Sequence, residues 1–202
     1  MDAIKLLKQD HKTVEALFKE FEGLGDRATK AKRKVVDKII RELSIHAAIE
    51  ETVFYPAIRA TAKKVEADEP DDDVLEALEE HHIVKWTLSE LEKIGPDDER
   101  FDAKVTVLME SVRHHVKEEE QDMFPEVKKL FEPEELKALG EALEAAKKTA
   151  PTHPHPRAPD QPPGNMVVGA VSAVIDRGVD AVRGMAKKVR GNKSESSEAG
   201  VH

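Results

Sequence analysis

Hydrophobic residues return at helical spacing in four long segments of this chain. These segments cover about residues 2–21, 28–59, 74–93 and 99–130, and in each an apolar side chain recurs every three or four positions. A shorter segment with the same spacing covers 133–148 and begins with proline, which the first turn of a helix tolerates. The pattern predicts an all-α fold: an antiparallel up-down-up-down four-helix bundle with a short fifth helix.

Short glycine-containing or acidic stretches separate the four segments. GLGD occupies 23–26, ADEPDDD occupies 67–73 and GPDD occupies 95–98, and each is typical of a loop. Connections of this length favour antiparallel neighbours, in agreement with a bundle.

The chain changes character after residue 150. Residues 151–165 include six prolines, which predicts an extended linker. Valines recur at helical spacing over 166–190 and predict an amphipathic C-terminal tail helix, followed by a disordered end. We therefore expect a bundle at 1–150, a linker at 151–165 and a tail at 166–202. The tail helix would suit a protein partner or a weak contact with a membrane.

The composition narrows the chemistry. The chain has no cysteine, which excludes disulfides, zinc–thiolate sites and iron–sulfur clusters. Residues 1–150 carry 25 Lys and Arg against 36 Asp and Glu, which argues against nucleic-acid binding. The N-terminus lacks the apolar core of a signal peptide, and no apolar stretch is long enough to span a bilayer. We expect a soluble cytoplasmic protein.

A motif that begins with histidine occurs twice. HAAIEETVFYP covers 46–56 and HVKEEEQDMFP covers 115–125; each has Glu four and five places after the His, an aromatic residue at nine and Pro at ten. A further histidine lies at a similar distance upstream of each copy, at His11 and His81. Positions i and i+4 share one face of a helix, so the His and the first Glu of each copy point the same way.

These residues predict a binuclear metal site in the bundle core. All four histidines lie on the apolar stripe of a helix, and burying them with two carboxylates would be very costly without a cation. Nitrogen and oxygen ligands without sulfur favour iron or manganese over zinc. The two carboxylates can each bridge two cations, which leaves open positions on both metals. The candidate ligands are His11, His46, Glu50, His81, His115 and Glu119.

The same motifs resemble the signature of hemerythrin-like HHE-domain proteins. The resemblance covers roughly residues 1–130 and lies in QDHKTV (9–14), HAAIEETVFYP, EEHHIVKWTLSEL (79–91) and HHVKEEEQDMFP (114–125). It implies a non-haem di-iron centre in a four-helix bundle, with two iron ions in an oxo- or hydroxo-bridged pair. Carried over residue by residue, the resemblance implies the same six ligands.

Two departures from the oxygen-carrying hemerythrins bear on function. Those proteins have a second histidine in the third helix where this chain has Lys85, and their last carboxylate is an aspartate five places after the fourth-helix histidine, whereas Glu119 stands at four. The missing nitrogen ligand favours reaction with hydrogen peroxide, nitric oxide or oxygen over oxygen storage. We expect a protein that reacts with such small oxidants, catalase-like or nitric oxide-reducing. The alternative is a non-enzymatic oxygen, nitric oxide or iron sensor or binding protein.

Several residues beside the ligands have two interpretations. His82 and His114 adjoin ligand histidines, and we expect them either on the surface or in contact with a ligand that they orient. Glu51 and Glu120 are expected on the solvated face, with a role beside the metals as the alternative. Lys85 is expected to extend its ammonium group outward.

Tyr55 is the only tyrosine of the chain, and Phe124 takes its place in the second copy of the motif. At nine residues past His46 an ideal helix would turn it away from the metals, which favours a packing role. The proline after Tyr55 disfavours helical geometry at this residue, so the backbone could bend there. The alternative interpretation makes the phenol a metal ligand, a radical site or a proton donor.

Overall fold

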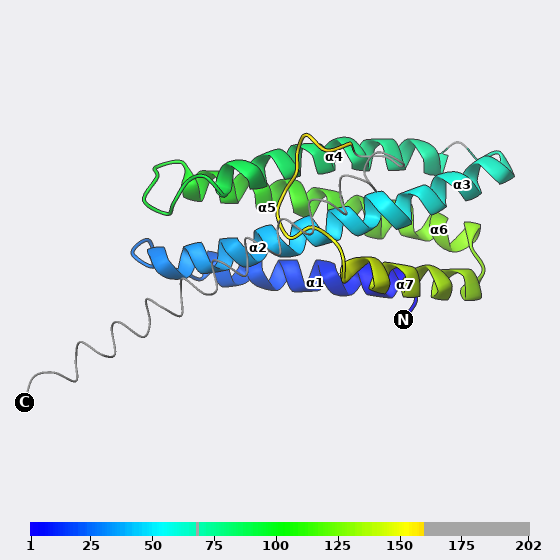
Figure 1. The fold of residues 1–202 in the computed structure, drawn as a ribbon, viewed down its shortest axis with the longest axis horizontal. Coiled ribbons are helices and arrows are strands. Elements are labelled where there is room, and N and C mark those ends of the chain that lie inside the picture. Colours follow the sequence, from blue (N-terminus) through cyan, green and yellow to red (C-terminus); the bar gives the residue numbers. More distant parts are fainter. Residues whose placement is uncertain (68, 160–202) are drawn as a thin grey trace, which may run out of the picture.

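The structure is a computed structural model that describes residues 1–67 and 69–159. Within these residues every regular element is a helix (Figure 1). The predicted tail helix and the end of the predicted linker lie outside the described residues. The elements are α1 (Ala3–Glu22), α2 (Thr29–Ile49), η1 (Glu50–Phe54), α3 (Tyr55–Val65), α4 (Glu69–Leu91), α5 (Phe101–Glu118), η2 (Glu119–Met123), α6 (Phe124–Leu130) and α7 (Pro133–Lys147).

In the described residues the elements before α7 form four rods, which lie side by side in a bundle (Figure 1). α2, η1 and α3 follow one another without a break, as do α5, η2 and α6, so two of the rods each contain a short π-helical turn. α1 packs against α2, and α4 packs against α5 and α3. α7 lies beside the part of α1 where the chain begins. The expected all-α bundle with a short fifth helix is confirmed.

Two apolar clusters fill the core, one on either side of a polar layer. In α1, Leu7 belongs to the first cluster and Val14 to the second, and His11 lies between them. The polar layer therefore crosses the middle of the bundle. In α4 the order is the same, with Leu78, His81 and Val84, and in the antiparallel rods it is reversed, with Leu43, His46 and Ile49 in α2 and Val112, His115 and Met123 in α5 and η2.

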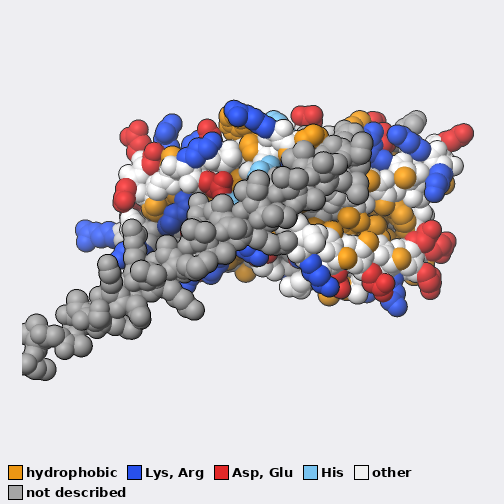
Figure 2. Space-filling model, in the orientation of Figure 1, with side chains coloured by type: hydrophobic (Ala, Val, Ile, Leu, Met, Phe, Trp, Pro, Cys, Tyr) orange, Lys and Arg blue, Asp and Glu red, His pale blue; other side chains and the backbone are white. Residues whose placement is uncertain are grey.

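The outside of the bundle is strongly charged. On the face drawn in Figure 2, acidic and basic side chains are intermixed, and hydrophobic side chains gather over the region between α3 and α7. None of the helices in the described part of the chain combines the length and the apolar character needed to cross a membrane.

The acidic stretch at 67–73 is not a loop as expected, because α4 begins at Glu69. Pro70 lies in the first turn, where a missing amide proton costs nothing, and acidic side chains are favoured at the positive end of the helix dipole. The chain turns instead at Glu66, which takes a left-handed conformation with φ of 55°. The acidic composition therefore marks the start of a helix, and the break comes just before it.

Residues 151–159, the described part of the predicted linker, contain no helix and lie against the bundle. Thr152 and Pro154 are buried, and the His153 ring forms a hydrogen bond with the side chain of Glu92, just past the end of α4. Together with Ala48 of α2 and Lys85 of α4, this segment encloses a largely apolar cavity of about 280 Å³.

Gly140→Ala should destabilise the protein, because α7 passes very close to the N-terminus at this position. A Cβ atom on Gly140 would lie 2.2 Å from the carbonyl oxygen of Met1. Overpacking of this kind costs roughly 1–3 kcal/mol, which outweighs the gain of about 1 kcal/mol in helix propensity. Thermal unfolding measures the effect. Gly25→Ala is the control, since nothing lies within 4 Å of its Cβ position, and an equal melting temperature for both variants would contradict the prediction.

Candidate metal centre

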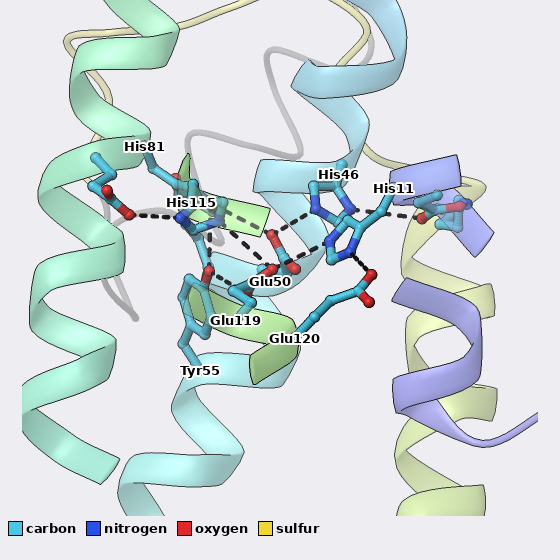
Figure 3. A network of polar contacts seen from close by, with 12 residues as sticks. His11, His46, Glu50, Tyr55, His81, His115, Glu119 and Glu120 are labelled. Carbon is cyan, nitrogen blue, oxygen red and sulfur yellow. Dashed lines mark hydrogen bonds and ion pairs between the residues drawn. The ribbon is translucent and has the colours of Figure 1, made fainter. Parts of the chain in front are cut away.

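Four histidines and two glutamates meet in the polar layer between the two apolar clusters (Figure 3). Each histidine comes from a different rod, and each glutamate is the first residue of a π-helical turn. None of the six is more than 6% exposed. The structure thus brings together all the candidate ligands that the sequence predicts: His11, His46, Glu50, His81, His115 and Glu119.

The donor atoms form two adjacent groups. In the first, Nε2 of His11 lies 3.2 Å from Oε2 of Glu119, and Nε2 of His46 lies 3.2 Å from Oε2 of Glu50. In the second, Nε2 of His81 lies 3.4 Å from the same oxygen of Glu50. Glu50 therefore takes part in both groups, as a bridging carboxylate would.

His115 completes the second group. Its Nε2 atom lies 3.2 Å from Nε2 of His81 and 3.6 Å from Oε2 of Glu119. Glu119 is thus shared between His11 on one side and His115 on the other. Within each group the donor atoms lie within 4.8 Å of one another, which is close enough for one cation to contact them all.

The other ring nitrogen of each histidine faces outward to a carboxylate. Nδ1 donates to Glu120 from His11 over 2.9 Å, to Glu51 from His81 over 3.1 Å, and to Glu80 from His115 over 2.7 Å. Nδ1 of His46 lies 3.7 Å from Oδ2 of Asp10. Because these contacts favour a proton on Nδ1, they leave the Nε2 lone pairs pointing to the centre, as metal ligation requires.

The buried atoms without hydrogen-bond partners concentrate at the centre. In the described residues eight buried side-chain nitrogen and oxygen atoms lack a partner, and five of them point inward from candidate ligands. Such atoms are rare in folded proteins because their desolvation is not offset. The set of nitrogen and oxygen donors therefore fits a pair of metal cations. The five atoms are Nε2 of His11, Nε2 of His46, both carboxylate oxygens of Glu50 and Oε2 of Glu119.

Burial and neighbouring charges shift the pKa values of the candidate ligands in different directions. Burial lowers the pKa of His46 to about 4, so this ring is neutral near pH 7. Burial, together with the charge of Glu119, raises the pKa of Glu50 well above its usual range. Burial would also raise the pKa of Glu119, but the neighbouring rings of His115 and His11 lower it far below its usual value. In the absence of metal, Glu50 thus holds a proton that a cation would displace.

Proline explains the π-helical turns that present the glutamates. Pro56 and Pro125 have no amide proton for the carbonyl four residues back, and each comes two residues after the end of a π turn. The amide of Tyr55 donates instead to the carbonyl of Glu50, five residues back. A π turn takes up an extra residue, so the residues after it rotate relative to an ideal helix.

This rotation brings Tyr55 into the centre (Figure 3). Its hydroxyl donates to Oε1 of Glu119 over 2.9 Å and lies 3.4 Å from Nε2 of His81. Burial, together with the charges of Glu119 and Glu50, raises the pKa of Tyr55. The expectation that an ideal helix turns this residue away from the metals is wrong, because the helix is not ideal there. Its counterpart Phe124 stacks on the ring of His11, with ring centroids 6.0 Å apart.

The model of the hemerythrin HHE cation-binding domain matches residues 2–127 of this chain. The chain belongs to the hemerythrin HHE family. A hemerythrin-like protein of Schizosaccharomyces pombe, itself uncharacterised, is 30% identical over 169 residues, which cover 84% of this chain and 80% of that protein. A DNA nickase of Nostoc is 26% identical over 147 residues, which cover 73% of this chain but only 39% of the nickase.

A solved structure supports the hemerythrin fold. The crystal structure of a hemerythrin HHE cation-binding domain-containing protein from Mycobacterium kansasii matches with a TM-score of 0.61 and 24% identity. The match covers 73% of this chain and 86% of that chain. Hemerythrin HHE domains bind metal, typically iron, and the two His and Glu groups are the candidates for doing so here.

Three expectations about residues near the hemerythrin centre are wrong. Lys85 does not extend outward: it is 7% exposed, and its Nζ atom donates to Oε2 of Glu51 over 3.0 Å. Glu51 is itself buried and accepts from His81. Glu120 is half-buried and accepts from His11 and from Lys8. Pairing offsets the cost of burial for these charges, which the pattern along a single helix does not reveal.

The remaining candidates lie outside the centre. His82 is exposed, and the side chain of His114 is 61% exposed, with Nε2 lying 3.1 Å from Oε1 of Glu118. Asp10 and Glu80, which face His46 and His115, are not among the residues predicted from the sequence. A signal for both was present, because Asp10 directly precedes His11 and Glu80 directly precedes His81.

Glu50→Gln should raise the stability of the metal-free protein at high pH and lower the stability of the metal-loaded protein. Because the folded-state pKa of Glu50 is raised, the stability due to its protonated form is fully present below the ordinary value of 4.5 and is lost as pH rises through the folded-state pKa. With a chelator present, the variant should therefore gain stability over the unchanged protein as pH rises. After metal loading the order should reverse, since the variant lacks a bridging carboxylate.

Melting temperatures measured across pH, with chelator and with metal, test this expectation. Glu110→Gln on the exposed face of α5 is the control for the loss of one carboxylate. A chelated Glu50→Gln protein that loses stability with rising pH in parallel with the unchanged protein would contradict the assigned pKa direction.

Proposed function

We propose that this protein holds two iron ions in a carboxylate-bridged pair and reacts with hydrogen peroxide in a catalase-like manner. His11 and His46 would hold one ion, His81 and His115 the other, and Glu50 and Glu119 would bridge them. The shared position of the two carboxylates between the histidine pairs supports this assignment. The absence of cysteine among the donors agrees with iron.

A small cavity beside the four imidazoles is the observation that carries the proposal. Its volume is about 20 Å³, which is room for roughly one water-sized molecule. A substrate that reaches the centre from this cavity must therefore be as small as peroxide, oxygen or nitric oxide. Besides the four histidines, the lining is aliphatic and excludes bulk water: Val14, Leu43, Ala47, Val84, Val112 and Val116.

The ligand count supports reaction over oxygen storage. Lys85 occupies the position of an additional histidine in the oxygen carriers, and its ammonium group is engaged by Glu51. Each iron would thus have two imidazoles and shared carboxylates, which leaves positions open on both ions. When bound, the iron pair supplies the reversible electron transfer by which one peroxide is oxidised to oxygen while a second is reduced to water.

The protein's own groups would hold the protons of this reaction. The phenol of Tyr55 places a proton 2.9 Å from Oε1 of Glu119. The Nδ1 protons of the histidines are held by the outer carboxylates, so the rings remain oriented with Nε2 inward. No external electron donor is required for peroxide disproportionation, whereas nitric oxide reduction needs one.

DNA cleavage is not part of this proposal, although one relative is named a DNA nickase. This chain covers only 39% of that protein. Residues 1–150 carry 36 acidic and 25 basic residues, and the resulting negative charge opposes contact with a phosphate backbone.

Metal analysis and oxygen evolution test the proposal directly. The iron-loaded full chain should contain two metals and release oxygen from peroxide. His46→Ala and Glu119→Ala should each lose metal and lower the rate by at least about tenfold, since even the partners that orient ligands change metal affinity by roughly 10–100-fold. His82→Ala is the control, because this exposed histidine adjoins a ligand in sequence.

The outcomes separate the candidate functions. Fewer than two metals per chain after exhaustive loading would contradict the iron pair. Full loading without oxygen release would contradict the enzyme and favour the oxygen, nitric oxide or iron sensor.

Tyr55→Phe tests whether the phenol is a ligand of the iron pair. The Tyr55 hydroxyl lies 3.4 Å from Nε2 of His81, about the distance that separates the two nitrogens of His81 and His115. The hydroxyl proton is nevertheless directed to Oε1 of Glu119, so we expect no phenolate-to-iron charge-transfer band in the visible spectrum of the loaded protein, and the same spectrum in Tyr55→Phe. Because Tyr55 is the only tyrosine, no other phenol can give such a band. A band in the loaded protein that Tyr55→Phe abolishes would contradict this expectation and make the phenolate a ligand.

A further inference from the structure

An acidic cleft between α4 and the α5–η2 rod leads to the metal centre. It has a volume of about 210 Å³, and its walls carry five carboxylates. Of the described residues that line it, none is Lys or Arg. The carboxylates are Asp73, Glu76, Glu80, Glu118 and Asp122.

The floor of the cleft consists of two candidate ligands. His115 and Glu119 line it and are almost fully buried, whereas Glu76 and Asp122 are exposed at its mouth. Oε2 of Glu119, which is buried, has no hydrogen-bond partner. The cleft therefore leads from the solvent to two residues of the metal centre, one of which carries an unsatisfied oxygen.

A third group of metal-type donors lies at the side of this cleft. Glu80, His114 and Glu118 offer ligand atoms within 4.8 Å of one another. Nε2 of His114 lies 3.1 Å from Oε1 of Glu118 and 3.8 Å from Oε1 of Glu80. The other oxygen of Glu80 accepts from Nδ1 of His115 over 2.7 Å. One carboxylate thus connects the outer group with the inner centre.

Glu80 also differs from the other carboxylates that face the ligand histidines. Asp10 pairs with Lys147, Glu51 with Lys85 and Glu120 with Lys8. Among the described residues, the ion pairs of Glu80 are with His114 and His115 rather than with a lysine. The negative charge that lysines neutralise elsewhere around the centre is therefore retained on the side of the cleft.

We propose that this acidic cleft is the route by which divalent cations reach the centre, and that Glu80, His114 and Glu118 form a loading site on the way. The inference rests on the proposed metal pair, because the cleft must lead to ions that are bound there. Nitrogen and carboxylate oxygen donors suit Fe²⁺, Mn²⁺ or Co²⁺. A cleft lined by one sign of charge between low-dielectric walls concentrates the opposite ion and raises its rate of association.

The approach past α2 and residues 149–159 is less suited to a cation. The cavity of about 280 Å³ on the side of α2 and residues 149–159 is largely apolar, and the ammonium group of Lys85 lies at its wall beside Glu51. A cation that came this way would meet a positive charge before it reached His81.

Metal uptake by the chelated full-length protein tests the loading site, with Co²⁺ as the probe. The rise of the cobalt absorption bands in stopped flow gives the rate, and metal analysis gives the final number of ions. Glu118→Gln and His114→Gln should fill the centre about tenfold more slowly and still end with two ions. Glu110→Gln, which removes a carboxylate from the exposed face of the same helix, should fill at the unchanged rate.

The dependence of the uptake rate on ionic strength tests the cleft with a second set of residues. Added salt should slow uptake by the unchanged protein more than uptake by the double variant Glu76→Gln, Asp122→Asn, because the variant has less charge to screen. Both residues are exposed, so folding should be preserved and can be checked by circular dichroism.

The outcomes distinguish this inference from the proposed function. If the unchanged protein binds fewer than two ions at saturation, the metal pair itself is wrong. If it binds two, and the cleft variants fill at the unchanged rate with the same salt dependence, the loading site is overturned. Folded cleft variants that end with fewer ions would also overturn it, because these residues would then belong to the permanent centre.

Discussion

Six ionisable side chains lie buried between two apolar clusters, and the rest of the structure depends on how they are held. Each imidazole turns one nitrogen to the centre and the other to a carboxylate of a neighbouring rod. These contacts run from α1 to η2, from α5 to α4, from α4 to η1 and from α2 back to α1, so they form a closed ring through all four rods. A rod that shifted along its axis would leave a buried charge without its partner, which is strongly destabilising.

In each copy of the repeated motif, the proline at its end cannot donate a backbone hydrogen bond, and a π-helical turn forms between the glutamate and this proline. The His and Glu of each copy share one face because they lie four residues apart at the end of an α-helix, and the π-helical turns at Glu50–Phe54 and Glu119–Met123 rotate the residues that follow. The same rotation carries the aromatic residue of each copy toward the centre, where the two copies differ. Tyr55 brings a hydroxyl to Glu119, while Phe124 brings only a ring face to His11. A nearly symmetric scaffold thus has one polar and one apolar side.

The sequence predicted the bundle and all six clustered residues because both depend on spacing within single helices. Helical periodicity placed His46 and Glu50 on one face. The second copy of the motif gave His115 and Glu119, and the histidine upstream of each copy gave His11 and His81. The errors at Lys85, Glu51 and Glu120 have a different origin, because each of these charges is held by a side chain of another rod or of another turn. Spacing along one helix cannot report such pairs. Tyr55 was misplaced because the rule of an ideal helix was applied across a π turn.

The charges around the ring agree with the proposed entry of cations from the side of the cleft. Three of the four outer carboxylates are held by lysines that come from three different helices: Lys8 of α1, Lys85 of α4 and Lys147 of α7. Each lysine offsets the cost of burying the carboxylate that it pairs with, and its positive charge weakens the attraction of that carboxylate for cations. A lysine beside Glu80 would have the same stabilising effect, but it would place a positive charge in the cleft above His115 and Glu119. His114 lies beside Glu80 and Glu118 instead, and an imidazole nitrogen is a common metal ligand, whereas an ammonium group has no lone pair to offer.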